Sequence, residues 1–181
     1  KWAMADGEIT HPHPICQQVN ALFCLAISEA IRTRSNPELL YQRILNWARM
    51  LEVEKELLET VDKAALHAPT GYVHQAGWVL VAFQNALWQM LHARDFEEAL
   101  VDTISRGGDT DTNAAICGAL LGALYGRSTI PQRWSVPVLN CRPEGGNLNI
   151  SHPRPRALWA TDVLDLVNQL IGYDRRIYEE S

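Results

Sequence analysis

A glycine turn that opens a helix of small residues constrains this 181-residue chain more than any other feature. Gly107 and Gly108 allow backbone angles that are closed to other residues, and they leave room for a ligand near the main chain. Asp109, Asp111 and Thr112 follow directly, and a run of small and apolar residues comes next. The stretch therefore predicts a tight turn that presents two carboxylates at the start of a helix.

The side-chain donor atoms of this turn are all oxygens. Asp109 and Asp111 are only two residues apart, so both carboxylates can turn toward one cation, with the Thr112 hydroxyl as a third oxygen. Oxygen-only donors suit magnesium, calcium or manganese rather than zinc. The sequence therefore predicts a site for a hard divalent cation.

The residues of this turn have three other interpretations. Ordinary capping of the helix by Thr110 or Asp111 explains the same residues without a ligand, and this alternative stays open. An EF-hand loop would need glycine and glutamate where the chain has Ala114 and Leu120. A phosphatase-type Asp-x-Asp motif should follow a buried strand, and the residues around Arg106 are no strand end.

The run over residues 107–126, GGDTDTNAAICGALLGALYG, closely resembles the C-terminal metal motif of the ADP-ribosylglycohydrolase family. That family includes the dinitrogenase reductase-activating glycohydrolases and the crystallin J1-like proteins. Residues 10–14, 70–73 and 153–156 are similar to the same family, so the resemblance covers nearly the whole chain. It implies the ADP-ribosylglycohydrolase fold, or a large C-terminal part of it.

The resemblance also implies an activity, which is hydrolysis of the bond that joins ADP-ribose to a protein side chain, with arginine favoured as the acceptor. In the family, two magnesium or manganese ions position the ribose hydroxyls and polarise water. Asp109, Asp111 and Thr112 match the C-terminal metal ligands, and His11 matches the histidine of the ADP-ribose pocket. The implied partner is an ADP-ribosylated protein or ADP-ribose.

Three further residues are expected to contact the substrate. Tyr72 lies in a break between helical stretches, where its side chain can reach a pocket, and Gly107 and Gly108 leave the backbone open to a ligand. His13 is expected to be an ordinary loop histidine.

The family's other metal ligands form a Thr-Asp-Asp run near its N-terminus, and its proposed acid/base glutamate lies further upstream. This sequence has no Thr-Asp-Asp run. We therefore assign no catalytic acid or base, expect weak binding of one ion, and favour a truncated enzyme that is inactive alone. Such a chain is expected to form a homo-oligomer or to associate with the missing N-terminal segment. A catalytically deficient ADP-ribose-binding module and a crystallin-like structural protein remain as alternatives.

Composition limits the other partners. Hydrophobic residues make up 47% of the chain and charged residues 20%, as in an ordinary soluble globule. The net charge of -5 argues against nucleic acid and anionic membrane surfaces as partners, and the apolar runs are broken by polar residues or glycine. The four cysteines include no C-x-x-C pair, and Cys16, Cys24 and Cys117 fall in apolar helical contexts. We therefore expect a cytoplasmic protein with reduced thiols.

Apolar residues recur at helical spacing, which predicts an all-α fold, a compact orthogonal array of helices in a single domain over residues 1–181. Helices are expected over residues 15–34, 38–52, 54–67, 74–93, 96–105, 112–126 and 157–171. The helix 74–93 is apolar on nearly every face and is expected to be central. Irregular structure is expected over residues 1–14, in a proline-rich surface strap after Gly126 with its tip at 147–150, and in a frayed tail over 172–181.

Overall fold

The computed structural model describes residues 1–146 and 149–179, with side chains described up to residue 172. These residues form α-helices and short 3-10 helices without any strand, which confirms the predicted all-α fold. The chain divides into two compact units, Lys1–Ile130 and Pro131–Ser181, and each is described by itself. The single domain expected over residues 1–181 stays a prediction.

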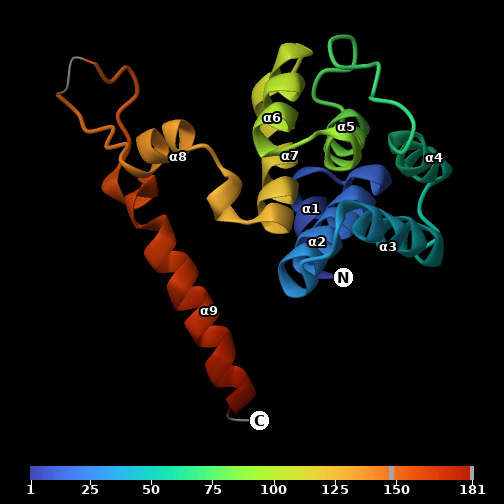
Figure 1. Ribbon diagram of the computed structural model, residues 1–181, viewed down its shortest axis with the longest axis horizontal. Helices are drawn as coiled ribbons and strands as arrows, with labels where there is room; N and C mark the ends of the chain where they lie inside the picture. The colour runs from blue at the N-terminus through green and yellow to red at the C-terminus, as the bar shows by residue number, and fades with distance from the viewer. Residues whose placement is uncertain (147–148, 180–181) are drawn as a thin grey trace. The chain divides into compact units, whose positions relative to one another are not determined.

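The first unit is a packed array of seven α-helices followed by one 3-10 helix (Figure 1). The helices are α1 (Trp2–Thr10), α2 (Pro14–Thr33), α3 (Pro37–Met50), α4 (Lys55–Ala64), α5 (Val79–His92), α6 (Phe96–Ser105), α7 (Thr110–Tyr125) and η1 (Arg127–Thr129). Side-chain caps fix several of the starts; at α3 and α6, Asn36 Oδ1 accepts the Leu39 N–H at 2.8 Å and Asp95 Oδ1 accepts the Glu98 N–H at 2.8 Å. The predicted helix 96–105 is confirmed to the residue.

Helix α5 lies at the centre of this unit, as predicted. It packs against α7 most extensively and also against α2, α3, α4 and α6. Its buried residues are Leu80, Val81, Ala82, Phe83, Asn85, Ala86, Leu87, Gln89 and Met90. The predicted start at residue 74 is wrong: Gly77 has a φ of +81°, outside the helical region, so the helix begins at Val79.

The expectation of irregular structure over residues 1–14 is also wrong, because α1 occupies residues 2–10. Its apolar pattern is weak, since Trp2 and Ile9 are 83% and 82% exposed. What holds α1 is a close approach to α2 at the buried Gly7, where an added Cβ would lie 2.4 Å from Asn20 Nδ2. Contact between a glycine and a polar side chain leaves no hydrophobic period in the sequence.

Helix α2 meets, by length and composition alone, the test for a helix that could cross a membrane. It has 20 residues and a mean hydropathy of 1.2 over its most apolar window, but 39% of that window is buried inside the structure. Core helices of soluble proteins pass the same test. Glu29 of α2 is buried and pairs with Arg43 of α3, so part of its polar surface is also used in packing. The finding is weak evidence for a membrane partner.

The second unit contains α8 (Gln132–Leu139), the 3-10 helices η2 (Arg156–Leu158) and η3 (Ala160–Asp162), and α9 (Val163–Glu179). Helix α8 lies within the stretch that was expected to be an irregular surface strap. Pro131 and Pro137 explain that expectation, because proline is usually excluded from the interior of a helix. The last helix begins at Val163 rather than 157, and it continues through most of the tail that was expected to fray. Residues 147–148 of the expected tip and residues 180–181 of the tail lie outside the described residues.

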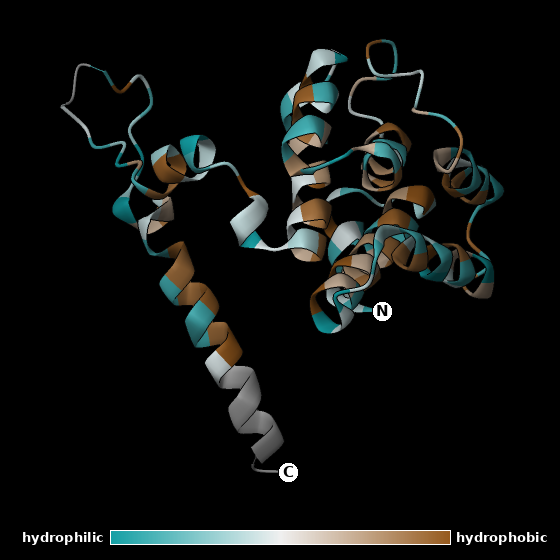
Figure 2. Cartoon of the chain, in the orientation of Figure 1, coloured by the Kyte–Doolittle hydropathy of each residue, from teal (hydrophilic) through white to brown (hydrophobic). Residues whose placement is uncertain are grey.

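The burial expected for the last helix is wrong. Apolar and polar residues follow one another at helical spacing over residues 163–172 of α9 (Figure 2). Five of the six residues expected to be buried are exposed, Leu158, Val163, Val167, Leu170 and Ile171, and Leu164 is half-buried. A helical period shows which residues share a face, whereas burial also requires a neighbouring element over that face.

The cysteines are all free thiols, but they differ in exposure. Cys117 is buried, Cys16 is half-buried, and Cys24 and Cys141 are exposed. The apolar context of Cys24 therefore did not predict its position, whereas Cys117 lies in the core as expected. Burial raises the pKa of the Cys117 thiol to about 12, so this side chain is a neutral thiol at neutral pH.

Candidate functional site

The turn over residues 107–112, called the acidic turn below, is shaped by its two glycines. Gly107 and Gly108 have φ angles of +77° and +72°, which disfavour any residue with a Cβ. At Gly108 an added Cβ would lie 1.7 Å from the carbonyl oxygen of Tyr72. The space beside Gly108 is therefore filled by the backbone of the turn around Tyr72.

Helix α7 begins directly after Asp109, which is its N-cap residue but whose side chain accepts no capping hydrogen bond from a backbone N–H of the helix. Asp111 lies in the first turn of α7, where its Oδ1 accepts the Thr112 N–H at 3.0 Å. Neither Thr110 nor Asp111 is the N-cap residue, so ordinary capping by these residues does not account for the turn. The Asp109 carboxylate remains available to a ligand.

The carboxyl groups of Asp109 and Asp111 lie close enough to interact. The hydrogen bond from the Thr112 N–H and, after it, the neighbouring Asp109 side chain hold the pKa of Asp111 below its ordinary value. Asp111 is consequently ionised at neutral pH. Two adjacent carboxylate groups are an arrangement that a cation stabilises.

The donor set is nevertheless incomplete for one ion. Among residues 1–146 and 149–179, no group of three or more His, Cys, Asp or Glu side chains is placed to hold a metal ion. Asp109, Asp111 and Thr112 offer two carboxylates and one hydroxyl, whereas magnesium takes six oxygen ligands and retains several waters. These three side chains fit a hard divalent cation as part of its coordination.

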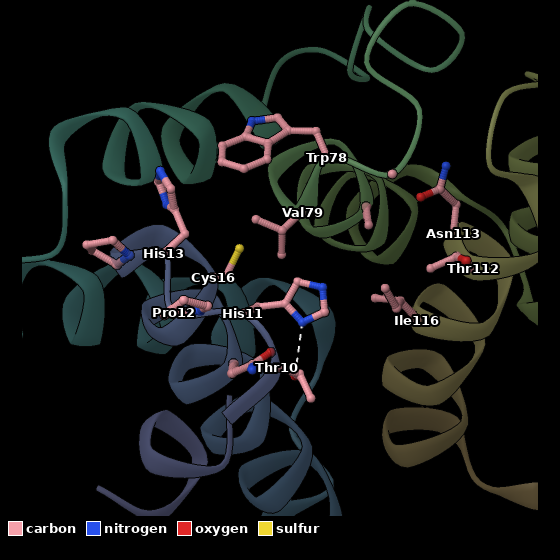
Figure 3. A pocket seen from close by; sticks show the side chains of 14 residues that line it. Thr10, His11, Pro12, His13, Cys16, Trp78, Val79, Thr112, Asn113 and Ile116 are labelled. Carbon is pink, nitrogen blue, oxygen red and sulfur yellow. Dashed lines mark hydrogen bonds between the residues drawn. The ribbon is translucent and has the colours of Figure 1, made fainter. Parts of the chain in front are cut away.

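A cavity of about 800 Å³ lies beside the acidic turn within the first unit. Fourteen residues line it, from the link between α1 and α2, the start of α5 and the first turns of α7 (Figure 3). His11 and Thr112 are both among them, on opposite sides of the cavity. Gly77 lines it as well, and a Cβ added to Gly77 would lie 3.8 Å from Asp109 Oδ2. The structure thus brings His11, Thr112 and the edge of the acidic turn to one cavity.

Two histidines face this cavity, and they are held differently. His11 Nδ1 is 3.0 Å from Thr10 Oγ1, a contact drawn in Figure 3. His13 caps α2, because its Nδ1 accepts the Ile15 N–H at 3.2 Å. This bond places the proton of the neutral His13 imidazole on Nε2. His13 is therefore more than the ordinary loop histidine that was expected.

Trp78 and Asn113 are cavity residues that the sequence did not single out. The Trp78 ring meets the His13 ring edge to face, with centroids 5.5 Å apart and an interplanar angle of 88°. Its sequence context suggested a core aromatic, but it precedes the first residue of α5 and is only half-buried. The signal that could have identified it is its place directly after Gly77, where the chain turns.

Tyr72 is placed differently from the expectation. It is 6% exposed, its hydroxyl donates to Asn85 Oδ1 at 2.6 Å, and Asn85 Nδ2 donates to Thr103 Oγ1 at 3.0 Å. Burial raises the pKa of Tyr72 well above its ordinary value. Tyr72 is not among the residues that line the cavity, and its contact with the acidic turn is through its backbone. Substrate contacts by Tyr72, Gly107 and Gly108 stay predictions.

A family model described as ADP-ribosylglycohydrolase matches residues 1–174 of this chain. Among curated relatives, an ADP-ribosyl-[dinitrogen reductase] glycohydrolase of Rhodospirillum rubrum is 25% identical over 134 residues, which cover 74% of this chain and 41% of the relative. A putative ADP-ribosyl glycohydrolase of Acanthamoeba polyphaga mimivirus is 42% identical over 80 residues, 41% of this chain and 24% of the relative.

A third relative is named an ADP-ribosylarginine hydrolase, from Serratia proteamaculans. It is 34% identical over 62 residues, 34% of this chain and 17% of the relative. The chain thus spans less than half the length of each of these curated relatives. No solved structure matches the chain.

Proposed function

The chain belongs to the ADP-ribosylglycohydrolase family, and from this premise we propose that it takes part in removing ADP-ribose from modified protein side chains. The observation that supports this proposal is the single cavity that joins His11 and Thr112 at the edge of the acidic turn. Its volume of about 800 Å³ falls within the range of small-molecule sites, roughly 300–1,000 Å³. Arginine is the proposed acceptor, because one of the similar proteins is named an ADP-ribosylarginine hydrolase.

Each site residue has a proposed task. Asp109 and Asp111 hold a magnesium or manganese ion through their carboxylates, and Thr112 adds its hydroxyl. Such an ion, when bound, supplies Lewis acidity toward water and the ribose hydroxyls. His11 donates an N–H to a phosphate or ribose oxygen. Gly107 leaves the main chain open to the ligand, whereas Gly108 and Tyr72, which meet through the Tyr72 carbonyl, hold the turn beside it.

The test combines metal binding and release of ADP-ribose. We expect Mn²⁺ to bind weakly in calorimetry, and Asp111→Asn to weaken binding by at least about tenfold, because it removes a charged oxygen ligand. Release of ADP-ribose from ADP-ribosylated arginine should require Mg²⁺ or Mn²⁺ and stop when EDTA removes the ion.

The matched control is Asp62→Asn, since Asp62 is an exposed carboxylate of α4 whose ion pair with Arg49 spans 3.8 Å. Equal Mn²⁺ binding by the Asp111 variant and the wild type would contradict the assigned metal ligands. Binding of ADP-ribose without any release would instead favour the alternative, a binding protein without turnover. The incomplete donor set of the described residues favours that alternative. If the protein neither binds nor releases ADP-ribose, a crystallin-like structural role would be favoured.

The proposed setting of this activity is the cytoplasm, where the four free thiols would stay reduced. We also propose that the protein self-associates or binds an N-terminal segment of the family's type. The support is the set of exposed large apolar side chains of the first unit, among them Leu25, Ile31 and Val101. Sedimentation velocity is expected to detect a concentration-dependent species larger than 20.3 kDa. A monomer at all concentrations, with no second polypeptide bound, would contradict this part of the proposal.

A further inference from the structure

Arg106, the residue directly before Gly107, makes several contacts that restrict its side chain. Its Nε donates to Asp102 Oδ2 at 2.6 Å and its Nη2 donates to Asp102 Oδ1 at 3.3 Å. The same Asp102 Oδ2 accepts Gln89 Nε2 at 2.5 Å. A two-point pair between guanidinium and carboxylate fixes orientation as well as distance, and Gln89 ties the pair to α5.

Two aromatic rings complete this environment. Arg106 Cζ lies 4.9 Å from the centroid of the Trp88 ring and 5.3 Å from that of the Tyr72 ring. Trp88 is itself stacked on His92, with ring centroids 5.0 Å apart and an interplanar angle of 17°. Only 28% of the Arg106 side chain is exposed. Contacts between a cation and an aromatic ring strengthen when water is partly excluded.

Tyr72 contacts both Arg106 and the acidic turn. Its ring contacts Arg106, while its carbonyl oxygen fills the space beside Gly108. The Tyr72 side chain cannot move freely, because its hydroxyl is bonded to the buried Asn85. The segment over residues 106–108 therefore contacts Tyr72 at both ends, through the side chain of residue 106 and the backbone of residue 108.

We propose that Arg106 is a positioning residue for the acidic turn. Held by Asp102, Trp88 and Tyr72, it fixes the backbone from which Asp109 and Asp111 project, so that the two side chains stay together before a cation arrives. The inference rests on the proposed metal-ligand role of these aspartates. Lysine cannot substitute for Arg106 here, because an ammonium has neither the planar face nor the two-point donor geometry.

The test compares Arg106→Lys with Arg43→Lys. Arg43 also pairs with a carboxylate in the first unit, Glu29, but this pair lies between α3 and α2. The first measurement is hydrogen exchange without metal at three amides of the turn, Gly107, Thr110 and Asn113, which bond to Ile104, Gly108 and Asp109 carbonyls. We expect Arg106→Lys to speed exchange at these amides by about tenfold. The control should leave them unchanged.

The second measurement is Mn²⁺ affinity by calorimetry, where Arg106→Lys should weaken binding by about fivefold and Arg43→Lys should not. If Arg106→Lys does not fold, Trp88→Phe removes part of one ring contact while leaving the ion pair, and it should change both readouts in the same direction. Unchanged exchange, or equal effects of the Arg106 and Arg43 variants, would overturn the proposal. Absence of Mn²⁺ binding by the wild type would contradict the proposed function, whereas the exchange data would still decide whether Arg106 fixes the turn.

Discussion

Gly108→Ala is expected to lower the free energy of unfolding by about 3–5 kcal/mol, through backbone strain and overpacking together. The φ of +72° at Gly108 is costly for any residue with a Cβ. The added Cβ would also lie 1.7 Å from the Tyr72 carbonyl oxygen, which is backbone and cannot rotate away. The acidic turn and the turn around Tyr72 must therefore separate. Urea denaturation followed by circular dichroism measures the effect.

Two other glycines provide graded controls for this prediction. Gly107→Ala meets the φ penalty alone, because its Cβ would lie 3.7 Å from Val73 Cγ2, an ordinary contact. Its cost should be about 1–2 kcal/mol. Gly122→Ala, inside α7 with nothing within 4 Å of the added Cβ, should stabilise by about 0.5–1 kcal/mol. A cost for Gly108→Ala no larger than that for Gly107→Ala would contradict the steric argument.

Gly107 and Gly108 illustrate what the sequence can predict about a glycine turn and what it cannot. The GG pair predicts positive φ angles, and both residues have them. The pair also predicts space for a ligand, but beside Gly108 that space holds the Tyr72 carbonyl. Sequence identifies the conformational freedom of a glycine, whereas the group that approaches its missing Cβ comes from a distant part of the chain. Here that part is 36 residues earlier.

The helices differ in the same way, because some depend on local sequence signals and others on contacts with distant residues. Helix α6 was predicted to the residue because Asp95 and Glu98 carry a local capping signal. Helix α1 was missed because Gly7 packs against the Asn20 side chain of α2 and α1 has no apolar stripe. The exposure of α9 was also missed, since its apolar period says nothing about what covers it.

At the candidate site, the family motif was enough to connect His11 with Thr112, which are separated by 101 residues in the sequence and share one cavity. It was not enough to find His13 and Trp78. Their contact depends on the starts of α2 and α5, which lie far apart in the sequence, meeting at the cavity. The contacts of Arg106 could not be predicted from the motif either, because the aromatic rings that it meets lie on other elements. Motifs identify residues that touch a ligand, and tertiary packing decides which residues hold those in place.

The second large effect is expected at the centre of the core. Phe83 of α5 is 1% exposed, and its replacement by alanine should lower the free energy of unfolding by about 3–5 kcal/mol, because a large buried ring leaves a cavity. That loss is a substantial part of the whole stability of a domain, about 5–15 kcal/mol. Phe23→Ala on α2 is the matched control. Phe23 is only half-buried, so the same change there should cost less.

The position of Phe83 links this prediction to the site. Its neighbour Ala82 lines the cavity, and α5 packs most extensively on α7, which carries Thr112 and Asn113. Loosening α5 should therefore shift the two sides of the cavity as well as lower stability. Urea denaturation of both variants measures the first effect, and hydrogen exchange at the Asn113 amide, which bonds to the Asp109 carbonyl at 3.0 Å, measures the second. If Phe83→Ala costs no more than Phe23→Ala, α5 is not the helix on which this unit depends, and the packing that holds the acidic turn against Tyr72 must have another origin.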